Sequence, residues 1–208
     1  MSDEEPNLAA MLEPVKDAQG DGRWMSQHNC FVQEYSMVQH MQQQEVWREF
    51  FSPLHALNFG IAGDTTCNVL WRLQNGELQN IRPTVVVVWV GTNNYQHTAE
   101  QEVMAIVQVL VNQLPRTKVI VLGLLPHGKR QNPLWEKNAD VNRLLRTAIS
   151  RLSPAQFFDL SSEFVHLNGT TVAKPLHDLL LQILEETPEE KHKMVDKNRK
   201  RKINALKE

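Results

Sequence analysis

One continuous apolar run, from Val85 to Val90, constrains the fold of this chain more than any other stretch. Five of its six residues are valine, the other is Trp89, and no polar residue interrupts them. Such a run predicts a strand buried on both faces, as in the centre of a parallel sheet. The run ends at Gly91-Thr92-Asn93-Asn94. Because open α/β sheets bind ligands outside the carboxyl ends of their strands, Asn93 and Asn94 are candidates for a functional site.

Strand and helix patterns alternate along the rest of the chain. Strand patterns also cover 54–59, 118–124 and 156–160, and apolar residues at helical spacing cover 24–32, 37–51, 69–73, 103–114, 141–152 and 176–184. This alternation predicts a three-layer α/β domain with right-handed crossovers. Four strands are expected where a flavodoxin-like sheet has five, and the absent strand would lie just before Ser36.

Composition excludes several classes of protein. The 208 residues suffice for one domain with a real core, and a net charge of −2 gives no global basic field, so we expect no nucleic-acid partner. Two cysteines, Cys30 and Cys67, provide no disulfide framework and favour a reduced, cytoplasmic setting. The acidic N-terminus does not resemble a signal peptide, and no apolar run is long enough to span a membrane.

The charge pattern predicts three parts: a polar N-terminal arm over 1–20, a folded domain over 21–186, and a charged, basic tail over 187–208. The tail contains Arg199-Lys200-Arg201-Lys202, which could be a nuclear-localisation or nucleic-acid-binding patch. The favoured interpretation is a solvated charged tail.

Three residues could carry ester chemistry. The N–H of Gly63 can approach a ligand closely, and Asn93 offers a side-chain NH₂ donor, so together they could form an oxyanion hole. Ser36 could be a nucleophile if a base lay beside it. Taken singly, each has a commoner structural explanation: a turn glycine, a turn or cap asparagine, and an N-cap serine.

Together these residues resemble a known family. The chain is similar to the alpha-type catalytic subunits of platelet-activating factor acetylhydrolase IB, which are SGNH-type, GDSL-like esterases. The similarity extends over nearly all of 21–191. The segments that carry it include Trp24-Met25-Ser26-Gln27-His28-Asn29, Phe51-Ser52-Pro53-Leu54-His55-Ala56-Leu57-Asn58-Phe59-Gly60, Gly63-Asp64-Thr65-Thr66, Val88-Trp89-Val90-Gly91-Thr92-Asn93-Asn94, Lys174-Pro175-Leu176-His177 and Glu185-Glu186-Thr187-Pro188-Glu189-Glu190-Lys191.

The resemblance implies a flavodoxin-like sheet and removal of the sn-2 acetyl group of platelet-activating factor, an acetylated ether phospholipid, through an acyl-serine intermediate. It implies no metal or organic cofactor. By motif, Ser36 matches the nucleophile, and Gly63 and Asn93 match the oxyanion-hole donors. The family forms dimers that bind the WD-repeat lissencephaly protein.

The chain departs from the family in three places. The first strand and the Gly-Asp pair before Ser36 are absent, although that strand is central in the family's sheet. Only Thr170-Thr171-Val172-Ala173 lie where the family carries its Asp-x-x-His block, so the triad aspartate and histidine are missing. A smaller shortening lies near Glu102.

No other histidine is expected to replace the lost base. His166 falls in a loop, where a solvated role is favoured, and His177 and Asp178 are adjacent on a helix, so their side chains should point apart. Without a base the serine stays protonated, and we expect impaired hydrolysis. Two alternatives stay open: a catalytically silent subunit that keeps the dimer and WD-protein contacts, and an unstable product of splicing or of an incomplete gene model.

Overall fold

The structure is a computed structural model that describes residues 23–33, 45–94, 99–126, 132–161 and 173–186. Its sheet contains β1 (Val85–Val88), β2 (Lys118–Leu122) and β3 (Ala155–Phe158), in the order β1-β2-β3. Both pairings are parallel, with Val86 opposite Val119 and Val121 opposite Phe157. The predicted α/β class with a parallel sheet is therefore confirmed.

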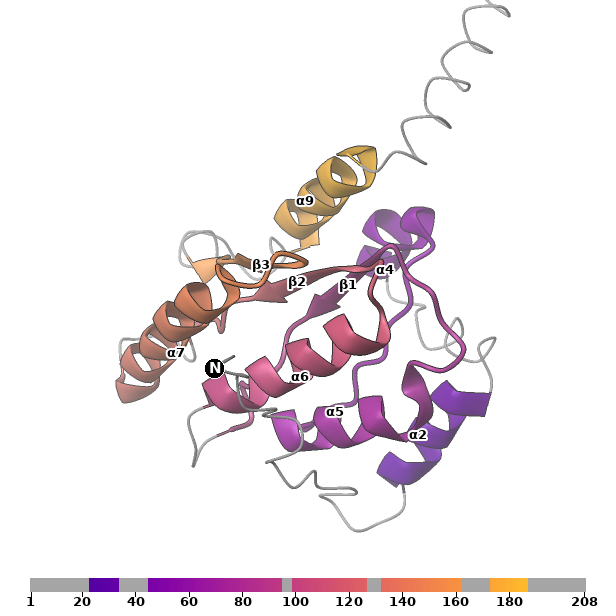
Figure 1. Cartoon of the computed structure of the whole chain (residues 1–208), viewed down its shortest axis with the longest axis horizontal. Coiled ribbons are helices and arrows are strands. Elements are labelled where there is room, and N and C mark those ends of the chain that lie inside the picture. The colour runs from indigo at the N-terminus through magenta and orange to yellow at the C-terminus, as the bar shows by residue number, and fades with distance from the viewer. Residues whose placement is uncertain (1–22, 34–44, 95–98, 127–131, 162–172, 187–208) are drawn as a thin grey trace, which may run out of the picture.

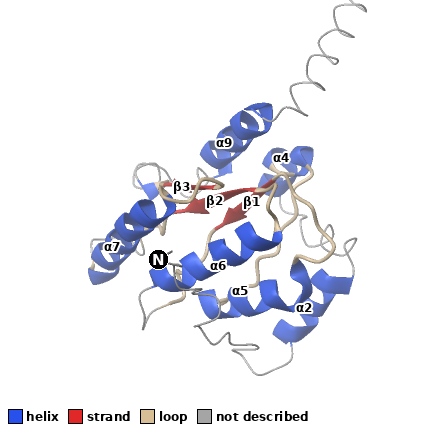
Figure 2. Cartoon of the chain, viewed as in Figure 1, coloured by secondary structure: helices blue, strands red, loops and turns tan. Residues whose placement is uncertain are grey.

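Helices cover both faces of this sheet, as Figures 1 and 2 show. On one face lie α5, α6 and α7, with α2 packed beside α5; on the other lie α4 and α9 (Figure 1). The bounds of the helices are α2 Arg23–Gln33, α4 Glu45–Phe50, α5 Thr66–Arg72, α6 Ala99–Gln113, α7 Pro133–Ile149 and α9 Ala173–Glu186. Short turns of other helix types cover Ser52–Leu54 and Leu73–Glu77.

The core has two apolar layers, one on each side of the sheet. Alternate strand residues supply each layer, because successive side chains of a strand point to opposite faces. Val86, Val88, Val119 and Val121 pack with α5, α6 and α7, whereas Val85, Val87, Ile120 and Leu122 pack toward α9 and the segment after α4. Both layers reach β1, whose four consecutive valines point alternately to the two faces of the sheet.

The central position predicted for the valine run is wrong within the described residues. There, β1 pairs only with β2, so it is an edge strand of the sheet. Its first three valines are only half-buried, whereas Val119 to Leu122 of β2 are buried. Trp89 follows the strand and is 49% exposed. The physical reason is that no described segment supplies the neighbour that would cover this edge.

The strand predicted over 54–59 is also wrong. Ser52–Leu54 forms a 3-10 turn that ends at His55, and the following residues belong to no sheet. Side-chain contacts satisfy this backbone instead: Arg72 Nη1 donates to the carbonyl of Phe59 at 2.9 Å, and Gly60 N donates to Asn58 Oδ1 at 2.9 Å. In a flavodoxin-like order this segment pairs with the first strand, and none of the described residues supplies that strand.

Two further expectations concern the ends of the chain and the membrane. The predicted arm at 1–20 and the tail at 187–208, including its basic cluster, lie outside the described residues. The division at 21 and 186 therefore stays a prediction. Within the described helices, none is long and apolar enough to cross a lipid bilayer.

Candidate active site

The loop that carries Gly63 ends in a well-formed start to helix α5. Thr65 is the N-cap, and it exchanges hydrogen bonds with Asn68, whose side-chain oxygen accepts from Thr65 N at 3.0 Å. Just before it, Asp64 N donates to the carbonyl of Ile61 at 3.2 Å and closes a turn. Gly63 has φ = 87°, a conformation that favours glycine. Thr65 caps α5 as threonine commonly does, because its side-chain oxygen accepts from a backbone N–H of the first turn.

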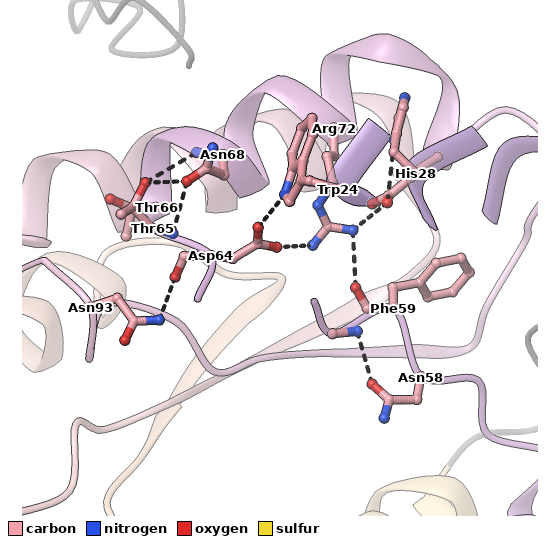
Figure 3. Close-up of polar contacts among 12 residues, drawn as sticks. Trp24, His28, Asn58, Phe59, Asp64, Thr65, Thr66, Asn68, Arg72 and Asn93 are labelled. Carbon is pink, nitrogen blue, oxygen red and sulfur yellow. Dashed lines mark hydrogen bonds and ion pairs between the residues drawn. The ribbon is translucent and has the colours of Figure 1, made fainter. Parts of the chain in front are cut away.

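The loop after β1 brings Asn93 to the same place. Gly91 makes the turn possible: its φ is 117°, and a Cβ atom there would lie 3.1 Å from a Leu124 methyl and 3.2 Å from Ala99 Cβ. Asn93 Nδ2 donates to the backbone carbonyl of Asp64 at 2.8 Å (Figure 3). Asn93 and Gly63 are the two residues predicted as oxyanion donors. The Asn93 side chain contacts Asp64, which directly follows Gly63 in the chain.

The donors on these two loops are not fully used by the described residues. An asparagine amide nitrogen carries two hydrogens, and the contact with Asp64 takes one of them. Gly63 itself is exposed. Within the described ranges, the two loops can therefore offer the Gly63 N–H and the second hydrogen of Asn93 Nδ2 to a developing oxyanion.

A buried ionic cluster holds Asp64, the residue after Gly63, in place. Asp64 Oδ2 accepts from Arg72 Nη2 at 2.7 Å, and Asp64 Oδ1 accepts from Trp24 Nε1 at 2.5 Å (Figure 3). Arg72 also forms an ion pair with Glu77, and His28 Nδ1 lies 3.6 Å from Glu77 Oε1. The cluster thus joins α2 to α5 and to the Gly63 loop.

Burial governs the charge of Asp64. Desolvation raises the pKa of its carboxyl above the ordinary 3.8, while the Arg72 charge and the hydrogen bonds from Trp24 and Arg72 oppose that shift. Its two oxygens are held by these internal donors. Asp64 therefore acts as a structural hydrogen-bond acceptor in the described site and is not placed to serve as a general base.

A second polar cluster forms around Asn94, the residue after Asn93. Asn94, Thr66 and Glu102 are joined by hydrogen bonds, and Lys137 Nζ donates to the Asn94 carbonyl at 3.1 Å. Beside it, burial raises the pKa of the Cys67 thiol above its ordinary 9.0, and the Glu102 charge and hydrogen bond act in the same direction.

Two hollows open on the described surface. One, of about 10 Å³, lies behind the Asn93 loop and is lined by residues that include Gly91, Asn94 and Lys137. The other, of about 400 Å³, follows β3 between Arg146 and Leu179. Neither Gly63 nor Asn93 lines either hollow. Among the described side chains, no group of three or more His, Cys, Asp or Glu is arranged to hold a metal ion.

The remaining predicted site residues are placed differently. Ser36 and His166 lie outside the described residues, so the distance from Ser36 to the oxyanion donors stays a prediction. The expectation for His177 and Asp178 is wrong: His177 Nδ1 and Asp178 Oδ1 are 3.3 Å apart. Asp178 is exposed and can bend back, while the His177 ring packs edge-on against Phe50 at 5.5 Å.

Comparison with known proteins identifies the family. The sequence profile of the GDSL-like Lipase/Acylhydrolase family matches residues 8–180. The chain belongs to this family. The match begins inside the predicted N-terminal arm and ends within α9.

Relatives within the GDSL-like family are acetylhydrolase subunits. The chain is 50% identical over 224 residues to platelet-activating factor acetylhydrolase IB subunit alpha2 of Rattus norvegicus and, with the same figures, to that of Homo sapiens, covering 92% of this chain and 98% of each relative. It is 54% identical over 205 residues to subunit alpha1 of Rattus norvegicus, covering 90% and 88%. The resemblance seen in the sequence is confirmed.

Sequence reasoning missed the supporting residues of this GDSL-like site. Asn94 was expected only as a candidate site residue beside Asn93, and Arg72, Glu77 and Glu102 were given no role in the site. One signal was available: Arg72 and Glu77 flank the inner apolar residues of a helix, and charges rarely become buried unless they are paired. Asp64 and Glu77 lie close to Arg72 in the chain, but the contact between Trp24 and Asp64 was not deducible, because 40 residues separate them.

Proposed function

We propose that this chain is an impaired serine acyl-ester hydrolase of the platelet-activating factor acetylhydrolase IB alpha type. Its reaction would be removal of the sn-2 acetyl group of platelet-activating factor, with Ser36 as nucleophile. The single observation that carries the proposal is the 2.8 Å contact between Asn93 Nδ2 and the Asp64 carbonyl, which sets Asn93 beside Gly63. The names of relatives at 50–54% identity supply the substrate.

Gly63 and Asn93 would stabilise the charge that develops during ester hydrolysis. When a serine oxygen attacks an ester carbonyl, negative charge develops on the carbonyl oxygen. Donors that already point at that oxygen stabilise the charge without reorganising, and losing one typically raises the barrier by about 3–4 kcal/mol. Gly63 N–H and the second hydrogen of Asn93 Nδ2 are the donors that we assign to this role.

The proposed impairment concerns the base that would activate the serine. The attacking serine must give up its proton, and the triad histidine normally takes it and then passes it to the leaving alcohol. The alignment with alpha2 spans 224 positions, more than the 208 residues of this chain, so parts of the relative have no counterpart here. This agrees with the absence of an Asp-x-x-His block between Gly169 and Lys174.

A second candidate is a catalytically silent subunit. The relatives carry the word subunit in their names, and the similarity covers about nine-tenths of this chain. In this role the chain would pair with another alpha-type subunit in the cytoplasm and bind the WD-repeat lissencephaly protein. Failure to co-purify with an alpha2 subunit or with that WD-repeat protein would contradict this role.

A fluorophosphonate probe tests the proposed esterase site. The probe forms a covalent bond with an activated serine, and peptide mass spectrometry then identifies the labelled residue. We expect slow labelling of Ser36 compared with the human alpha2 subunit, and still slower labelling in Asn93→Ala. Labelling as fast as in alpha2 would contradict the impairment. Labelling of no serine, or labelling of Ser36 that Asn93→Ala leaves unchanged, would contradict the site.

A further inference from the structure

Every hydrogen-bonding group of Asn94 is engaged by a described residue. Its backbone N donates to the Gly91 carbonyl at 3.1 Å, and its carbonyl accepts from Lys137 Nζ at 3.1 Å. Its side-chain oxygen accepts from Thr66 N at 3.1 Å, and Nδ2 donates at 2.5 Å both to Thr66 Oγ1 and to Glu102 Oε2. Asn94 therefore has no hydrogen left for an oxyanion, whereas its neighbour Asn93 does.

These contacts fasten the loop after β1 to three separate helices. Thr66 is the first residue of α5, Glu102 lies in the first turn of α6, and Lys137 belongs to α7. Glu102 Oε2 accepts from the Thr66 hydroxyl as well as from Asn94, so one carboxylate oxygen holds both partners. The Thr66 side chain is fully buried, which shields these bonds from water.

The clamp formed by Thr66, Asn94 and Glu102 joins the two loops that carry the assigned oxyanion donors. Asn94 follows Asn93 directly, and Thr66 lies three residues after Gly63. We propose that Glu102, acting through Asn94 and Thr66, is a positioning residue that fixes Asn93 Nδ2 relative to Gly63 N–H. This inference rests on the proposed function, because that function assigns Asn93 Nδ2 and Gly63 N–H to an oxyanion hole.

A small displacement of the donors would matter. Oxyanion donors act at about 2.7–3.1 Å from the charged oxygen, and misplacing reacting groups by about 1 Å can cost about 100-fold in rate. A carboxylate that only stabilised the fold would, when removed, lower stability without moving Asn93 away from Asp64. The two roles therefore differ in what happens to the Asn93 side chain in the folded protein.

NMR spectroscopy of the full chain with ¹⁵N-labelled asparagine distinguishes these roles. The two Nδ2 hydrogens of Asn93, assigned by their loss in Asn93→Ser, should shift and exchange with water at least about tenfold faster in Glu102→Ala. Glu102→Gln keeps an oxygen acceptor of the same shape and should restore the wild-type signals. Glu100→Ala removes a charge from the same first turn of α6 and should leave them unchanged.

Thr66→Val is the second variant, for use if Glu102→Ala does not fold. It removes one donor to Glu102 and should move the Asn93 signals in the same direction. Unchanged Asn93 signals in a folded Glu102→Ala or Thr66→Val protein would overturn the positioning role. The NMR result decides this role alone, whereas a failure of the fluorophosphonate probe to label Ser36 would count against the proposed function.

Discussion

Asn93 Nδ2 and the backbone carbonyl of Asp64 are 2.8 Å apart, although 29 residues separate them in the chain. This contact joins the loop after β1 to the loop that carries Gly63. It brings together the two donors that the sequence suggested for an oxyanion hole. Two polar clusters, one around Arg72 and one around Glu102, include the residues next to this contact, Asp64 itself and Asn94.

We expect Arg72→Met to lower the free energy of unfolding by about 3–5 kcal/mol, because it leaves two buried carboxylates, Asp64 and Glu77, without their cation. Chemical denaturation measured by circular dichroism gives the value. Arg143→Met is the matched control, since its partner Asp140 is as exposed as Arg143 itself and such a pair contributes about 0–1 kcal/mol. Equal losses in the two variants would contradict the role given to the buried cluster.

The Cys67 thiol should react slowly with an alkylating reagent at neutral pH, because the thiolate is the reactive form and its pKa is raised. Glu102→Gln removes a neighbouring negative charge and should lower that pKa, so alkylation at pH 8.5 should become faster. A Cys30→Ser background ensures that only Cys67 reacts, and mass spectrometry follows the rate. An alkylation rate that is unchanged or lower in Glu102→Gln would show that the Glu102 charge does not raise the pKa of this thiol.

The edge of β1 predicts self-association. Edge strands with unpaired backbone groups and apolar side chains promote pairing between chains, and a charged residue suppresses it. Trp89 follows β1 and is 49% exposed, so Trp89→Lys should reduce association at high concentration. Sedimentation velocity over a range of concentrations measures this effect. Identical profiles for the wild type and Trp89→Lys would indicate that this edge is covered.

Local patterns predicted most of the elements. The valine run, the strand pattern at 118–124 and the helical spacing of α6, α7 and α9 each carry their own signal. A strand, in contrast, depends on its neighbours. The segment 54–59 has strand-like residues but no described partner, and β1 has a strong pattern yet lies at an edge. Hydrophobic periodicity indicates which face of a strand is apolar, but it does not indicate which other strand pairs with it.

The candidate site was predictable only where the family motif reached it. Gly63 and Asn93 match that motif, but their side-by-side arrangement does not follow from a common sheet rim, because the segment before Gly63 belongs to no sheet; the Asn93 contact with Asp64 joins the two loops. Glu102 was not found, because a glutamate in the first turn of a helix is usually explained by the helix dipole. Its contacts with Thr66 and Asn94 depend on how α5 and α6 pack, which no local pattern encodes.

Hydrolysis of platelet-activating factor, measured beside the human alpha2 subunit, tests the central claim most directly. We predict a rate at least about 10⁴-fold lower for this chain, because the proposed site keeps the oxyanion donors without the catalytic base. Ser36→Ala should lower that rate little further, since members of a triad act as a unit. A rate within about tenfold of alpha2 that Ser36→Ala abolishes would contradict the account, because it would require a working base in this chain.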